Sequence, residues 1–370
     1  MAPRPPPTLS ECLEGRGNNL DFLRFAAATG VIVSHSVPLG AGPKGGSEPL
    51  TVFTHGQVSL GLVCVAVFLV ISGLLITRSW ERSRDVRSFL LARTLRIFPG
   101  LAVSLLLTTF VLGAAFTTHP LGEYFSAPDT YTFLLRNFTL VDPQWNLPGV
   151  FEGNVYPGAV NGSLWTLKYE VGFYLLVLGL GVTGLLRKEL ALAGWCVTAV
   201  LAFLHIGRLG FWPVLGLYFG GGLVLYLWRE RVRMSPWLAV ACVVVLIASS
   251  MAGKGLPVAI GSCGAYLVLY LAFLPGRLSH FGRHGDFSYG LYIYAFPVQQ
   301  AVTAVLGGPM PWWWNATLSL AFTLLLGMMS WRYIEKPAIS LRHRERSSAH
   351  SMLEFKANHT SSYRKSSPRQ

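Results

Sequence analysis

Long apolar stretches recur along the chain, and short segments rich in charge, glycine or proline separate them. A helix needs roughly 20 apolar residues to cross the hydrocarbon core of a bilayer, so each stretch predicts one membrane-spanning helix. We expect an all-α, polytopic helical bundle whose helices, about ten, lie near residues 20–38, 57–77, 97–116, 161–184, 190–206, 210–228, 236–252, 256–274, 286–306 and 312–333.

Composition indicates the same class of protein. Hydrophobic residues make up 52 % of the chain and charged residues 13 %, whereas soluble domains carry about 25 % charged residues. The formal net charge is +13, but the basic residues lie between apolar stretches and form no single basic face. We therefore expect membrane lipids, and no nucleic acid, among the partners of this protein.

The distribution of Lys and Arg predicts the orientation of the bundle, because cytoplasmic loops are enriched in both. If the N-terminus is cytoplasmic, most of the 30 Lys and Arg residues fall on the cytoplasmic side, and Lys44, Lys168 and Lys254 are among the few outside. An even number of helices then returns the C-terminus to the cytoplasm. We expect a multi-pass protein of the plasma membrane, which is the inner membrane of a bacterium.

Three regions follow from the polar ends of the chain. Residues 19–338 form the expected membrane domain, residues 1–18 a cytoplasmic leader, and residues 339–370 a basic cytoplasmic tail that we expect to be disordered. Residues 1–19 are polar and rich in proline, so we expect no cleavable signal peptide and a first helix that acts as an anchor. The longest outer segment, about 117–160, carries aromatic residues that either stack on sugar rings or anchor the membrane interface, and we favour anchoring: Trp145, Phe151 and Tyr156.

Two ionisable residues lie within the first apolar stretch, where charge is costly and usually faces a partner or a cavity. Arg24 and His35 are eleven residues apart, so they share a helix face at about 16 Å along the axis. Structural roles would suffice for each alone: Arg24 can snorkel to the interface and His35 can hydrogen bond between helices. Together they favour function, because an imidazole accepts a proton near neutral pH. Asp21, one turn earlier, is the expected partner of Arg24.

Two further sites place charge at membrane depth. The segment 78–96 carries six arginines, and the bias towards cytoplasmic positive charge explains their number. It does not explain why Arg93 and Arg96 enter the third apolar stretch, where two guanidinium groups could hold a phosphorylated ligand. Glu170 lies about 13 Å below the outer surface if its helix begins near residue 161, a depth similar to that of His35. It either joins a structural ion pair or orients the imidazole.

Six segments of this chain occur together, in the same order, in a known family. They are Leu20 to Arg24 followed by His35, Phe68-Leu-Val-Ile-Ser72-Gly73, Arg93-Thr-Leu-Arg96, Ser163-Leu-Trp165-Thr166 followed by Glu170, Ser288-Tyr289-Gly-Leu-Tyr292, and Glu335-Lys336-Pro337. The chain therefore resembles the membrane-bound acyltransferase 3 family over about residues 20–338. It departs from many relatives at Ala295, where they carry a histidine. No soluble esterase-like domain follows the membrane part, so we expect the stand-alone form.

The resemblance implies an O-acetyltransferase of the exopolysaccharide or lipopolysaccharide type. Such an enzyme transfers an acyl group, usually acetyl, from cytoplasmic acyl-CoA to a hydroxyl of an outer glycan or lipid-linked saccharide. Acyl-CoA (acetyl-CoA) would be a co-substrate, and we expect no permanently bound cofactor and no metal. Arg24, Arg93 and Arg96 would bind acyl-CoA. His35, oriented by Glu170, would act as a general base or would form an acyl-imidazole, and the sequence leaves both mechanisms open.

A second function class stays open at this point. In a proton-coupled transporter or flippase, Arg24, His35 and Glu170 would form a proton or substrate path. Many transporters consist of two related halves, and we find no such halves in this sequence. A membrane scaffold without chemistry is a third reading, in which replacing His35 would be harmless.

Overall fold

The computed structural model describes residues 5–15, 17–42, 46–204 and 207–341. Within these ranges the chain is all-helical, with no β-strand and two isolated β-bridges, Thr8 to Arg233 and Thr117 to Val150. The predicted all-α class is confirmed. The predicted disordered tail falls almost entirely on residues 342–370, which lie outside the described residues, as does Lys44.

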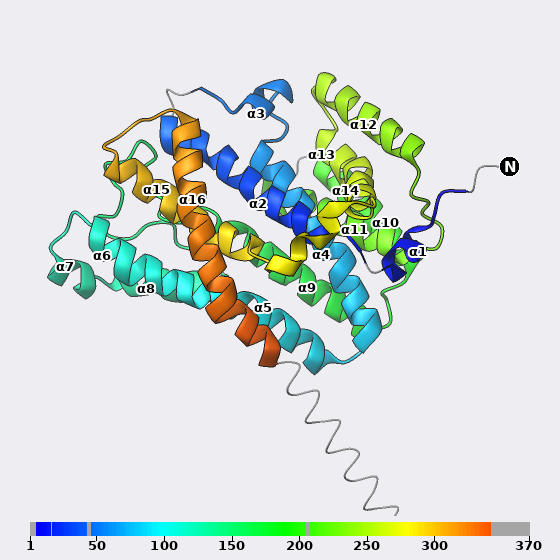
Figure 1. The fold of residues 1–370 in the computed structure, drawn as a ribbon, viewed down its shortest axis with the longest axis horizontal. Coiled ribbons are helices and arrows are strands. Elements are labelled where there is room, and N and C mark those ends of the chain that lie inside the picture. Colours follow the sequence, from blue (N-terminus) through cyan, green and yellow to red (C-terminus); the bar gives the residue numbers. More distant parts are fainter. Residues whose placement is uncertain (1–4, 16, 43–45, 205–206, 342–370) are drawn as a thin grey trace, which may run out of the picture.

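The helices follow one another with short connections, many through single π-helical or 3₁₀ turns (Figure 1). Their bounds are α1 Leu9–Glu14, α2 Leu20–Ser36, α3 Pro49–Phe53, α4 Leu60–Ser83, α5 Val86–Leu106, α6 Gly113–Phe116, α7 Leu121–Ser126, α8 Pro128–Thr139, α9 Leu167–Val182, α10 Lys188–Phe203, α11 Trp212–Leu227, α12 Pro236–Met251, α13 Leu256–Ala259, α14 Ala265–Ala272, α15 Ser288–Val305 and α16 Trp312–Ser330.

Several helices are long and apolar enough to cross a membrane. In the described part of the chain five continuous helices meet this criterion, and a pair bent by 84° would make a sixth. All ten predicted stretches are helical, but α10, α11 and α12 have only 16 residues each. A helix of that length spans about 24 Å, less than the roughly 30 Å of hydrocarbon. The structure therefore establishes a membrane protein and does not establish ten spans.

Helices α4 and α11 approach each other unusually closely, because glycine lies at their contact. A Cβ atom on Gly73 of α4 would lie 2.0 Å from the carbonyl oxygen of Phe219, and one on Gly222 of α11 would lie 2.0 Å from that of Val70. Small residues at such contacts let helix backbones pack directly in membranes. Helix α2 packs against α4 and also against α15 and α16 (Figure 1).

The N-terminal segment is not a detached leader where the structure describes it. Leu9 and Leu13 of α1 are buried, and the Leu9 amide donates to the carbonyl of Val232 at 2.8 Å. Arg78 at the end of α4 donates to the carbonyl of Leu13 at 2.9 Å. Helix α1 is thus bound to the connection between α11 and α12 and to the end of α4.

The aromatic residues of segment 117–160 have two different environments. Phe151 is buried and packs against Phe116, with ring centroids 5.1 Å apart, so it belongs to the core. Trp145 and Tyr156 are 45 % and 41 % exposed. Of the three aromatic residues singled out in the sequence, Trp145 and Tyr156 are therefore the accessible ones.

Candidate active site

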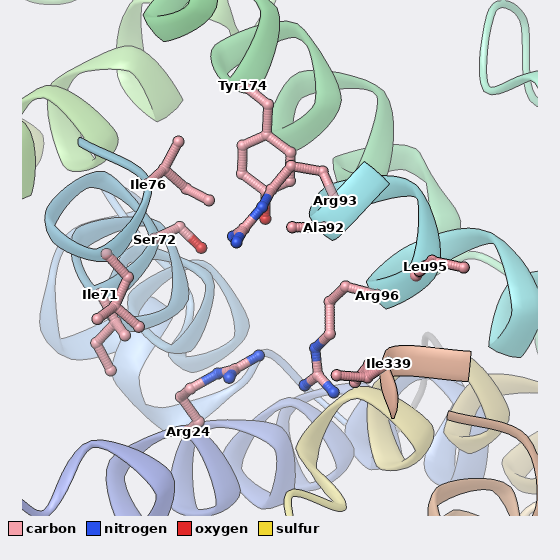
Figure 2. Close-up of a pocket in the computed structure, with 11 residues that line it drawn as sticks. Arg24, Ile71, Ser72, Ile76, Ala92, Arg93, Leu95, Arg96, Tyr174 and Ile339 are labelled. Carbon is pink, nitrogen blue, oxygen red and sulfur yellow. The ribbon is translucent and has the colours of Figure 1, made fainter. Parts of the chain in front are cut away.

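The three arginines singled out in the sequence meet at one cavity of about 180 Å³ between α2, α4, α5 and α9. Figure 2 shows Arg24 entering from α2, and Arg93 and Arg96 entering from α5. One turn of helix separates the last two, so their side chains leave α5 on one face. The other lining residues are mostly apolar and include Ile71, Ser72, Leu75, Ile76, Ala92, Leu95, Tyr174 and Ile339.

Acidic side chains compensate two of the three arginines. Asp286 Oδ2 lies 2.7 Å from Arg24 Nη1 and 2.5 Å from Arg96 Nη2. Arg96 also contacts Glu335, at 3.3 Å, and Glu335 is completely buried. Arg24 thus pairs with Asp286, where the sequence led us to expect Asp21.

Asp286 lies just ahead of α15, and its surroundings determine its charge. The guanidinium groups of Arg24 and Arg96, both within hydrogen-bond distance, favour the charged form of this carboxyl. Asp286 is therefore a carboxylate at neutral pH. Sequence reasoning missed it, although an acidic residue two positions before the Ser288-Tyr289 element was a usable signal.

Arg93 has a different environment from Arg24 and Arg96. Its guanidinium carbon lies 5.9 Å from the ring centroids of both Phe89 and Tyr174, which fits cation-π contacts. Its Nε is buried, and among the described residues this atom has no hydrogen-bond partner and the side chain has no ion pair. Arg93 is thus the arginine whose donors are most available to a ligand.

Glu170 lies on the arginine side of the bundle. It accepts hydrogen bonds from Ser72, at 3.2 Å, and from Tyr174. It also lines a second cavity of about 60 Å³ that shares Arg24, Arg96 and Tyr174 with the first. The structure therefore brings Glu170 together with the arginines.

The element at residues 163–166 and the element at 288–292 meet at the wall of this second cavity. The hydroxyls of Thr166 and Tyr292 lie 2.5 Å apart, and Tyr292 donates to the carbonyl of Ser163 at 2.8 Å. Tyr289 donates to the carbonyl of Ile97 at 2.7 Å, one residue beyond Arg96. Segments far apart in the sequence are thus joined around the two cavities.

His35 lies farther along α2, and its ring packs edge-on against Phe296 with centroids 5.4 Å apart. Its Nδ1 is buried without a hydrogen-bond partner among the described residues. No hydrogen bond joins it to Glu170 in that part of the chain. The eleven residues from Arg24 correspond to about 16 Å along the helix. The structure thus separates His35 from the arginine cavity and does not pair it with Glu170.

No group of three or more His, Cys, Asp or Glu side chains that could hold a metal ion is found within the described ranges. The cavities are lined instead by guanidinium groups, hydroxyls, one carboxylate and apolar side chains. Such a lining suits an anionic ligand with an apolar part.

Comparison with known proteins places this arrangement in a family. Residues 18–332 match the acyltransferase domain of the acyltransferase 3 family. An O-acetyl transferase of Shigella phage Sf6 is 28 % identical over 340 residues, covering 87 % of this chain and 96 % of that protein. Nodulation protein 10 of Rhizobium leguminosarum bv. viciae is 28 % identical over 378 aligned positions, covering 90 % and 96 %. No solved structure matches significantly. Because the family match spans most of the chain, this protein belongs to the acyltransferase 3 family.

Proposed function

We propose that the protein transfers an acyl group, most simply acetyl, from cytoplasmic acyl-CoA to a hydroxyl of a glycan outside the cytoplasm. The family match supports acyl transfer, and the relative named an O-acetyl transferase supports acetyl and an oxygen acceptor. The observation that carries the proposal is the cavity lined by Arg24, Arg93 and Arg96 inside an apolar helical bundle. Buried guanidinium groups of this kind bind phosphate and carbonyl oxygens strongly.

The proposed topology has ten spans in the inner membrane, with both termini in the cytoplasm. Six arginines lie within residues 78–96, at the end of α4, in the two-residue connection and in the first turns of α5, which places this connection in the cytoplasm under the positive-inside rule. Arg93 and Arg96 follow this connection within three turns of α5. The arginine cavity therefore opens towards the side where acyl-CoA is available, and His35 lies towards the acceptor side.

In the proposed reaction His35 removes the proton of the acceptor hydroxyl. The oxygen attacks the thioester carbonyl, the carbon–sulfur bond breaks, and the CoA thiolate takes the proton back from the imidazolium. The flexible pantetheine arm of acyl-CoA bridges the distance between the arginine cavity and His35. In the alternative mechanism His35 itself attacks the thioester and forms an acyl-imidazole. The sugar hydroxyl then attacks the acyl carbon, and the imidazole leaves.

Glu170 remains a functional residue in this proposal, but it acts in the donor cavity. Its hydrogen bonds to Ser72 and Tyr174 hold the wall beside Arg93. A direct role in orienting His35 would require the two side chains to move together.

Membrane vesicles of opposite orientation test the proposal. Inside-out vesicles expose the cytoplasmic face, so labelled acetyl-CoA added to them should give base-labile label in glycan, and right-side-out vesicles should not. Label that enters the vesicles without becoming esterified would support the transporter reading. Equal esterification in both orientations would contradict a cytoplasmic donor site.

A further inference from the structure

A third cavity lies where the end of α4, the start of α5 and the end of α9 come together. Its volume is about 500 Å³, within the range of roughly 300–1,000 Å³ that small-molecule sites occupy. The arginine cavity, at about 180 Å³, is below that range and cannot enclose a whole acyl-CoA. The third cavity is lined by Trp80, Glu81, Arg84, Val86, Gly181, Val182, Gly184 and Leu186.

The third cavity and the arginine cavity are stacked along the same three helices. On each helix a residue lining one cavity and a residue lining the other are four or seven positions apart, which is close to one or two whole turns. They therefore lie on the same helix face, about 6–10 Å apart along the axis. The pairs are Ile76 and Trp80 on α4, Val86 and Arg93 on α5, and Tyr174 and Gly181 on α9.

A layer of large side chains lies between these two cavities. The rings of Trp80 and Phe89 pack edge to face with centroids 5.7 Å apart. The guanidinium group of Arg93 lies over the ring of Phe89. A Cβ atom on Gly181 would lie 2.1 Å from Trp80 Nε1, so α9 presses directly on the indole. A wide cavity and a smaller one, stacked on the same helix faces with one layer of side chains between them, fit a ligand with a bulky head and a thin arm.

The third cavity carries positive charge at its rim. Arg84 is exposed and makes no ion pair within the described residues. Arg187 Nε donates to the carbonyl of Gly184, which places a second guanidinium at the lining, at 3.2 Å from that oxygen. The acidic lining residue Glu81 is compensated, because Arg229 and Tyr226 contact it at 3.2 Å and 2.8 Å. Phosphate groups would therefore meet net attraction there.

We propose that the third cavity binds the nucleotide end of the acyl-CoA donor, with Arg84 and Arg187 contacting its phosphates. The pantetheine arm then follows α4 and α5 past Trp80 into the arginine cavity. This inference rests on the proposed function, since it assigns a second subsite to the same donor. An anionic lipid headgroup carries the same phosphate chemistry, so the test separates the two sources.

The test compares two donors that differ only in the nucleotide. Steady-state kinetics of purified full-length protein are measured with acetyl-CoA and with acetylpantetheine, which has no nucleotide. Arg84→Gln should raise KM for acetyl-CoA on the order of tenfold, because one charged hydrogen bond to phosphate is lost. It should leave KM for acetylpantetheine unchanged. Arg82→Gln is the matched control, because Arg82 is exposed on the same helix end and does not line the cavity.

A steric variant tests the same site without removing charge. Val86→Trp fills part of the third cavity and should also raise KM for acetyl-CoA only. Equal effects of Arg84→Gln or Val86→Trp on both donors would overturn the inference, because the nucleotide would then not be what these residues contact. So would an effect of Arg84→Gln seen in bilayers with anionic lipid but absent in neutral phosphatidylcholine, since lipid would then be the occupant.

A binding measurement keeps the inference separate from the proposed function. If the wild-type protein transferred acetyl from neither donor, the proposed function would fail. Titration with 3′,5′-adenosine diphosphate would still decide on the cavity. Binding to wild type and to Arg82→Gln that is lost in Arg84→Gln supports the inference, and no binding to wild type refutes it.

Discussion

At the scale of single residues, the three cavity arginines differ in what holds them. Arg96 pairs with two carboxylates, Asp286 and Glu335, and Arg24 pairs with Asp286. Arg93 rests on aromatic rings and has an unsatisfied Nε in the described structure. The Arg-x-x-Arg motif thus contains one arginine whose ion pairs stabilise the fold, Arg96, and one whose donors are available to a ligand, Arg93.

Substitution should separate these two roles. Arg93→Gln should raise KM for acetyl-CoA at least several-fold while the thermal unfolding midpoint stays near that of wild type. Arg96→Gln should lower the unfolding midpoint, because it leaves Glu335 buried without its ion partner. Kinetics and thermal unfolding on the same detergent preparations check both. A stable Arg96→Gln variant with only a raised KM would contradict this assignment.

Asp286 should be the most important partner in the ion-pair network for stability. Asp286→Asn leaves two largely buried guanidinium groups with less compensation, which should cost about 3 kcal/mol of unfolding free energy. Asp142→Asn is the control, because Asp142 pairs with Arg136 at 3.5 Å on an exposed surface where ion pairs contribute little. Equal unfolding midpoints for the two variants would show that the network does not stabilise the fold.

The sequence predicted the arginines of this network but not their acidic partners. Arg24, Arg93 and Arg96 stand out in the sequence because they interrupt apolar stretches. Their partners do not, since Arg24 and Asp286 are 262 positions apart and only the tertiary fold joins them. The expected partner, Asp21, was chosen by helix spacing, which ignores every other helix.

At the scale of elements, apolar patterning located every helix of the bundle core but misplaced some helix starts. Helix α5 begins at Val86, eleven residues before the apolar stretch that predicts it. Hydropathy indicates where a chain enters lipid or the protein core, whereas a helix begins where its first turn is capped. Here Asp85 caps α5, because its carboxylate accepts a hydrogen bond from the Ser88 amide at 2.7 Å. Arg93 and Arg96 are thus helical residues held in fixed register.

The glycine contact between α4 and α11 gives a prediction at this scale. Gly73→Ala places a Cβ atom against the Phe219 carbonyl and should destabilise the protein by about 1–3 kcal/mol, the usual cost of overpacking. Gly179→Ala is the control, because nothing lies within 4 Å of its Cβ position on α9. It should be neutral or slightly stabilising, since alanine favours helix. Thermal unfolding of both variants distinguishes a packed contact from a general glycine effect.

At the scale of the whole molecule, the number of membrane-spanning helices and their orientation are predicted from the sequence. Ten apolar stretches are easy to read from sequence, because hydropathy is local. Whether the shorter helices α10 to α12 cross the bilayer depends on tilt and on local bilayer thickness, which sequence does not specify. Likewise, the convergence of the arginines with Glu170 follows from how the helices pack and not from any single helix, whereas the separation of His35 from Arg24 follows from their spacing along α2.

Labelling of introduced cysteines tests the topology across α12. In a variant without the five native cysteines, Arg231→Cys should react with a membrane-impermeant maleimide only after the cells are opened. Lys254→Cys should react in intact cells. The two sites flank Pro236–Met251, so labelling from the same side would mean that α12 does not cross the membrane.

The central claim is that His35 performs acyl transfer at the far end of α2 from the arginine cavity. The most direct test is the NMR measurement of base-labile O-acetyl esters on surface glycans of a host that lacks its own acetylating enzymes. The host expresses wild type, His35→Gln or the exposed control His119→Ala at equal membrane levels. We predict that His35→Gln lowers the rate of acetylation by about 10²–10⁴-fold, as expected for loss of a general base, while His119→Ala matches wild type. Normal acetylation by His35→Gln would contradict the account.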